Sequence, residues 1–150
     1  MKRSAAREVA VRLCYSAEIA GMENAEFVAD FFAEEHYATL SIEDELFATA
    51  PDAVQLNYIN SVVSMVFEHK DELNAIIEQH AKGWSLKRIS KIALRILRCA
   101  LCEILYMEDV PERVAINEAV NLAKKYEEPE TVSFINGVLG GFVRARQETV

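Results

Sequence analysis

The chain has 150 residues, enough for one domain or for two small helical halves that share a core. Its net charge of −8 argues at first against nucleic acid, because an acidic protein repels phosphate. The charges are unevenly placed, however: four bases fall within residues 1–12, and residues 82–102 contain bases and no acid. The acidic total therefore does not exclude RNA as a ligand.

The composition predicts an all-α fold. Glycine and proline are scarce, helix-forming residues are abundant, and no long run of alternating β-branched residues occurs. We expect six to seven helices in two small packed bundles. They would form a single domain over residues 1–150, with an N-terminal half at 1–83 and a C-terminal half at 84–150.

The three cysteines and the hydropathy pattern indicate where the protein works. No run of about twenty apolar residues could span a membrane, and no apolar leader follows the first residues. Unpaired cysteines suit a reducing compartment. We therefore expect a soluble, cytoplasmic protein without a membrane partner.

The first expected helix covers residues 4–20, with Ser4 as its cap and Gly21 as its end. Its inward positions are expected to include Ile19. Further along, Ser41 and Asp44 resemble a capping box in which Asp replaces Glu. These signals predict helices separated by short connections.

A longer helix is expected to open at residues 51–52, and a further helix follows over residues 71–82, which Gly83 can end. The first of these carries apolar side chains at helical spacing. They are Val54, Tyr58, Val62, Met65 and Val66.

The C-terminal half begins with Trp84, which we expect to fill the joint between the halves. The most hydrophobic helix, over residues 93–106, should be central, and helices over 112–126 and 131–146 follow. Arg98 is expected to point inward to an acid, either Glu118 or Glu103. One helix face is expected to be buried through Val114, Ile116, Val120 and Ala123.

No motif in the sequence indicates catalysis. Cys99 and Cys102 would share one helix face, but no second Cys/His pair stands at ligand spacing, so both are interpreted as core residues. The three histidines, His36, His69 and His80, are interpreted as surface residues. There is no glycine-rich phosphate loop, nucleophile elbow or zinc-protease motif. We expect no enzyme, no cofactor and no metal.

The amino-terminal bases suggest phosphate binding. Arg3 and Arg7 stand four residues apart, so on a helix their guanidinium groups lie on one side, with Lys2 just before them. Such a set can clamp a phosphate. A solvated chain terminus is the equally good alternative on these residues alone.

Five segments from Leu97 onward then give a specific pattern. In order and spacing they resemble the NusB family of bacterial transcription antitermination factors, and matches at Ala6–Glu8, Leu13–Tyr15 and Trp84 extend the likeness over nearly the whole chain. The segments are Leu97-Arg98-x-Ala100-Leu101-x-Glu103, Val110-Pro111, Val114–Ala119, Leu122–Lys125 and Phe134–Leu139.

The resemblance implies two helical bundles and a function without catalysis. NusB-like proteins pair with NusE, a small-subunit ribosomal protein, and the pair binds boxA RNA so that RNA polymerase reads through terminators. Single-stranded RNA suits cations, a helix amino end and a stacking ring. The RNA-binding positions carried over are Lys2, Arg3, Arg7, Thr131, Ser133 and Phe134. For Phe134, a simple core ring remains an equal alternative.

The positions carried over for the protein partner are Glu8 and Tyr15, with the exposed side of the helix around Ala93 and Arg95. Members of the family commonly have an acid where this chain has Ala93. The partner contact is therefore remodelled, or a self-association surface replaces it.

Two other functions stay open. Similar domains occur as the N-terminal part of RNA methyltransferases, which would make this chain an accessory RNA-binding module. A homodimer could instead cover the amino-terminal bases and inhibit itself.

Overall fold

The computed structural model describes residues 1–23, 25–31 and 50–148. Within these residues it contains seven α-helices, one short 3₁₀ helix and no strand, which confirms the predicted all-α fold. The predicted capping box at Ser41 and Asp44 and the position of His36 lie outside the described residues.

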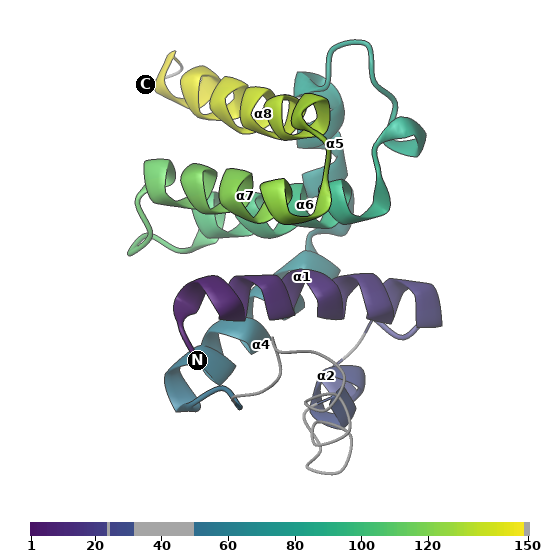
Figure 1. Ribbon diagram of the computed structural model, residues 1–150, viewed down its shortest axis with the longest axis vertical. Helices are drawn as coiled ribbons and strands as arrows, with labels where there is room; N and C mark the ends of the chain where they lie inside the picture. Colours follow the sequence, from purple (N-terminus) through teal and green to yellow (C-terminus); the bar gives the residue numbers. More distant parts are fainter. Residues whose placement is uncertain (24, 32–49, 149–150) are drawn as a thin grey trace. The chain divides into compact units, whose positions relative to one another are not determined.

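Figure 1 shows the helices in their order along the chain. None of those that the structure describes is long and apolar enough to cross a membrane. Their bounds are α1 Arg3–Ala20, α2 Ala25–Phe31, α4 Ala53–Glu68, α5 Lys70–His80, η2 Leu86–Arg88, α6 Lys91–Tyr106, α7 Glu112–Tyr126 and α8 Pro129–Glu148.

The chain divides into two compact units, Met1–Glu68 and His69–Val150. We expected the two halves to meet at Gly83 instead. The difference arises because α5 packs against α6 and α8, so that it belongs with the C-terminal helices. Each unit is described by itself below.

The helix ends in the first unit agree with the sequence signals, except for the predicted cap of α1. Lys2, not Ser4, is the N-cap of α1, and its side chain makes no capping hydrogen bond. Gly21 ends the helix at φ 69°, a left-handed conformation that glycine adopts without steric cost. At the start of α4, the Asp52 carboxylate accepts a hydrogen bond from the Gln55 backbone N–H at 2.9 Å.

The core of the first unit lies where α1 packs against α4. Two predicted core positions are wrong, because Ile19 and Val54 are exposed. The buried stripe of α1 ends at Ala17, and its next position would be Ala20, so Ile19 points elsewhere; Val54 precedes the buried part of α4. The buried apolar residues of these helices include Ala6, Val9, Ala10, Leu13, Ala17, Ile59, Val62 and Val63.

Helix α6 is the centre of the second unit, as predicted. Its side chains are buried on every face from Ala93 to Ile104. Three of these buried side chains are charged, those of Arg95, Arg98 and Glu103, and the rest are apolar. The N-cap of α6 is Ser90, whose hydroxyl oxygen accepts a hydrogen bond from the Ala93 N–H at 3.1 Å. The same hydroxyl donates a hydrogen bond to the Glu127 carboxylate.

Helices α7 and α8 run antiparallel beside α6 (Figure 1). The predicted buried face of α7 is partly wrong: Val114 is exposed, and Ile116 and Val120 are half-buried. The buried residues are Ala115, Ala119 and Ala123, one per turn. Small side chains let neighbouring helices approach closely, so packing selects the alanine stripe over the larger apolar residues.

The last helix begins earlier than predicted. Pro129 is its first residue rather than a break before it, because a helix's first position needs no N–H donor and suits the fixed φ of proline. This places Thr131, Ser133 and Phe134 inside the first two turns of α8.

Candidate nucleic-acid interface

The amino-terminal bases form an ordered cluster on α1. The Arg3 guanidinium carbon lies 4.3 Å from the centre of the Tyr58 ring, and that of Arg7 lies 5.9 Å from the same centre. Arg3 Nε also donates a hydrogen bond to Gln55 Oε1 at 2.7 Å. The prediction that the two arginines share one side of the helix is therefore confirmed. We call Arg3, Arg7 and Tyr58 the arginine–tyrosine cluster.

Tyr58 and Gln55, both on α4, are the members of this site that the sequence did not reveal as functional. Tyr58 is only 4% exposed, and the helical spacing of α4 identified it as a core residue. A cation over a tyrosine face gains about 0.5–2 kcal/mol, which helps to hold long, flexible side chains in place. Lys2 is exposed beside them, at the N-cap. The cluster thus presents ordered positive charge.

The other RNA-binding positions implied by the family resemblance lie at the start of α8. Ser133 is exposed, and Thr131 and Phe134 are half-buried. The Phe134 ring packs on Trp84, with ring centres 5.0 Å apart and planes at 39°. Phe134 is therefore neither a fully buried core ring nor a freely exposed one, and both of its expected roles remain compatible with its position.

The backbone at the start of α8 has fewer free N–H donors for an anion than expected. Pro129 has no N–H, and the Thr131 N–H donates to the Glu128 carbonyl at 3.0 Å. The next N–H, that of Val132, donates to the same carbonyl at 3.1 Å. Side chains rather than free backbone N–H groups must supply most phosphate contacts here.

The positions carried over for the protein partner are less accessible than expected. Ala93 is fully buried and Arg95 is 5% exposed, so the exposed helix side predicted around them is wrong. The cause is that α6 is covered on all faces from Ala93 to Ile104. The Arg95 guanidinium donates a hydrogen bond to the Lys91 carbonyl at 3.0 Å. Glu8 is buried too, and Tyr15 is half-buried. Of these four residues, Tyr15 keeps the most surface.

Arg98 points inward, as predicted, and is buried. Its Nε donates a hydrogen bond to Asn74 Oδ1 at 2.9 Å, so α6 is tied to α5. An ion pair between Arg98 and Glu118 stays a prediction. The sequence missed Asn74 because the two residues belong to different helices with no shared pattern.

Three further sequence interpretations can be compared with the structure. The thiols of Cys14, Cys99 and Cys102 are buried, which fits the interpretation of Cys99 and Cys102 as core residues. His69 and His80, interpreted as surface residues, are half-buried: the His69 ring stacks on Tyr106, and the His80 ring meets Phe142 edge-on. Among the described residues, no three His, Cys, Asp or Glu side chains gather as a metal site would require.

Similarity to known proteins covers nearly the whole chain. The pattern of the NusB family matches residues 4–144. The transcription antitermination protein NusB of Clostridium novyi is 37% identical over 145 residues, which are 97% of this chain and all of that protein. The NusB protein of Acetivibrio thermocellus is 40% identical over 146 residues, covering 97% of this chain and 91% of that one.

Solved structures of similar fold agree. The solution structure of NusB from Aquifex aeolicus is 26% identical, with a TM-score of 0.69 over 99% of this chain and 93% of that one. A crystal structure of the antitermination factors NusB and NusE in complex with double-stranded RNA gives a TM-score of 0.72 at 24% identity, over 95% and 96% of the two chains. From sequence and fold together, the chain belongs to the NusB family.

Proposed function

We propose that this protein is a cytoplasmic transcription antitermination factor that binds boxA-type single-stranded RNA together with a NusE-type small-subunit ribosomal protein. It would act within the antitermination complex of RNA polymerase and catalyse no reaction. The observation that carries this proposal is the family match over residues 4–144 to proteins named for antitermination.

The arginine–tyrosine cluster supports the RNA part of the proposal. Guanidinium groups bind phosphate through paired N–H donors, and ordering them in advance lowers the entropy lost on binding. The cluster lets Arg3 and Arg7 contact the backbone of any sequence. This surface would supply affinity rather than recognition of bases.

The half-buried ring of Phe134 supports the preference for single strands. A ring can stack only on a base that is not already stacked inside a duplex, and such bases occur in single strands, loops and bulges. A solved relative binds double-stranded RNA together with NusE, so paired RNA of equal length is the informative competitor.

The negative net charge of the chain supports a protein partner of opposite charge. With a net charge of −8, the chain attracts a basic protein over long range and speeds its association. Such a partner would also add positive charge next to the RNA. We therefore expect tighter RNA binding in its presence.

The test is a titration of fluorescently labelled boxA-type RNA, followed by anisotropy, at two salt concentrations with and without the NusE-type protein. We expect the partner to raise RNA affinity, and the affinity to fall as salt rises. Scrambled RNA of equal length serves as the control. Absence of both the partner effect and the salt dependence would refute the proposal, and methyl transfer by the isolated protein would favour the enzyme-module alternative.

A further inference from the structure

A groove of about 460 Å³ lies within the second unit, between the end of α5 and the face of α8. Its volume falls in the range of small-ligand sites, roughly 300–1,000 Å³. Two aromatic rings, Trp84 and Phe134, and two long cations, Lys82 and Arg144, contribute to its lining. We call it the Trp84 groove.

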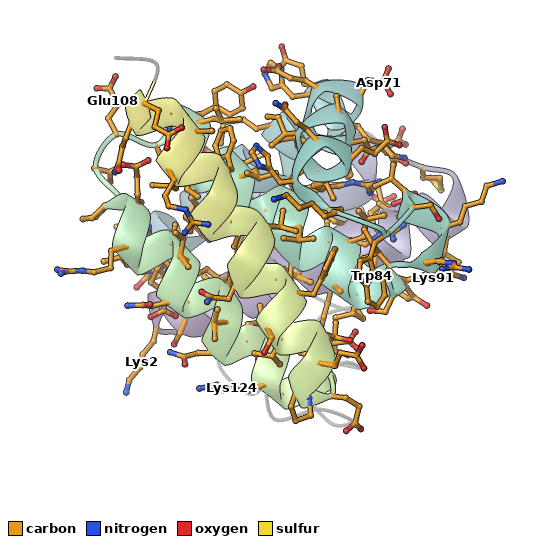
Figure 2. All side chains as sticks on the ribbon, turned by 90° about the horizontal axis from the view of Figure 1, so that it is seen from above. Lys2, Asp71, Trp84, Lys91, Glu108 and Lys124 are labelled. Carbon is orange, nitrogen blue, oxygen red and sulfur yellow. The ribbon has the colours of Figure 1, made fainter. Side chains whose placement is uncertain are left out.

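The aromatic pair leaves part of one ring open. Trp84 stands on the connection between α5 and α6 (Figure 2) and is 36% exposed, unusual for so large an apolar side chain. Phe134 packs on it at 5.0 Å between ring centres and supports the indole. An indole that is held in place and partly open is a surface on which a flat ring can stack.

The cations of the groove are available. Lys82 and Arg144 are both exposed, and within the part of the chain that the structure describes neither takes part in an ion pair. Lys82 lies on the connection after α5 and Arg144 in the last turns of α8, and both line one groove. Positive side chains beside an open ring fit a ligand that joins an aromatic base to a phosphate.

Glycines keep the groove open on the α8 side. A Cβ atom at Gly137 would meet no atom within 4 Å, so the missing side chain leaves free space above the helix. At Gly141 a Cβ would come within 3.3 Å of His80 Nδ1, a tight contact. Larger residues at these positions would fill the groove or push His80 away.

We propose that the Trp84 groove holds one unpaired nucleotide of the bound RNA, with its base stacked on the Trp84 indole and its phosphate held by Lys82 and Arg144. This inference rests on the proposed function and extends the RNA surface from Phe134 to residues on the connection after α5. The Glu148 carboxylate, which also lines the groove, can only accept hydrogen bonds from the base when ionised.

The chain provides its own probe for the test, because Trp84 is its single tryptophan. Protein labelled with 5-fluorotryptophan gives one ¹⁹F signal, even when an unlabelled NusE-type protein is present. Labelled boxA-type RNA is titrated in parallel and followed by anisotropy. We expect the ¹⁹F signal to shift with the same midpoint as the anisotropy, and not to shift when the partner is added alone.

The variant pair separates the groove from general charge effects. Lys82→Ala/Arg144→Ala should lower RNA affinity roughly tenfold at 0.1 M salt and reduce the slope of log affinity against log salt by about 1–2. Arg88→Ala/Lys91→Ala removes the same charge from exposed residues that do not line the groove, and should change the affinity much less. All four side chains are exposed, so both variants should melt like the wild type.

The outcomes are distinguishable. RNA binding that leaves the ¹⁹F signal unmoved overturns the groove inference and leaves the proposed function standing. A shift caused by the partner alone, or an equal shift at the same concentration of a free mononucleotide, also overturns it. If the anisotropy detects no RNA binding at all, the proposed function fails and the groove inference fails with it.

Discussion

The two candidate RNA surfaces both combine aromatic rings with cations, but they differ in which of the two groups is exposed. In the arginine–tyrosine cluster the aromatic ring lies inside, only 4% exposed, with two guanidinium groups over it. In the Trp84 groove a ring is 36% exposed and the cations stand beside it. The exposed group is the one that an RNA can contact: the guanidinium groups in the cluster, and the ring in the groove. The comparison therefore teaches that the cluster suits phosphates, whereas the groove suits bases.

The largest expected effect comes from removing the charge of the cluster. Arg3→Ala/Arg7→Ala should lower RNA affinity at 0.1 M salt on the order of twentyfold and reduce the salt slope by about 1.4, whatever the RNA sequence. Anisotropy titrations with boxA-type and scrambled RNA measure both. Arg88→Ala/Lys91→Ala is the matched control. A loss confined to one RNA sequence would mean that the cluster reads bases, against the comparison.

The next effect concerns the ring on α8. Phe134→Leu keeps an apolar side chain against Trp84 but removes the aromatic face, so RNA affinity should fall roughly fivefold to tenfold, because base stacking contributes about 1–3 kcal/mol. The loss should be smaller for duplex RNA of equal length. A thermal melt accompanies the titration: if Phe134→Leu destabilises the protein while the RNA affinity of the folded fraction is unchanged, Phe134 is a core ring.

A smaller effect is expected at Tyr58, because it acts through the arginines. Tyr58→Phe keeps the ring under Arg3 and Arg7 and should bind RNA like the wild type. Tyr58→Leu removes the ring and should weaken RNA binding about threefold, since a cation–π contact contributes roughly 0.5–1 kcal/mol near a surface. Comparing the two variants at equal folded concentration, checked by circular dichroism, isolates the ring. Equal losses in both would assign the effect to the hydroxyl instead.

The smallest expected effect on RNA affinity is at Gly137, where one substitution should change stability and binding in opposite directions. Gly137→Ala places a Cβ in open space within α8, so the unfolding free energy should rise by about 0.5–1 kcal/mol, because alanine favours the helix. The same methyl group narrows the Trp84 groove, and RNA affinity should fall about twofold. Denaturant unfolding and anisotropy measure the two effects. An affinity that rises with stability would argue that no ligand uses this part of the groove.

Sequence reasoning was most successful where a pattern is local. The spacing of Arg3 and Arg7 predicted a shared side of α1, and the apolar run of residues 93–106 predicted the central helix, because both follow from helical geometry alone. The resemblance to the NusB family, carried by short segments of sequence, implied the same helical fold. These signals need no knowledge of distant contacts.

The errors came from contacts between helices. Nothing near Tyr58 in the sequence indicates that it lies beneath two arginines of another helix, and nothing near Arg98 indicates Asn74. On α7, hydrophobicity favoured Val114, whereas close packing against neighbouring helices selected the alanines. Trp84 was expected to fill the joint between the two halves, but 36% of its surface is exposed.

The three buried cysteines allow the local unfolding of each unit to be measured in the wild-type protein. Cys14 belongs to the first unit, and Cys99 and Cys102 belong to the second. A buried thiol reacts with an alkylating reagent only when the surrounding helices open, so its labelling rate reports local unfolding. Mass spectrometry of pulse-alkylated wild-type protein can therefore time the opening of each unit separately, without any substitution. Repeating the measurement with RNA present would show in which unit the ligand slows local opening, as a lower rate of thiol alkylation.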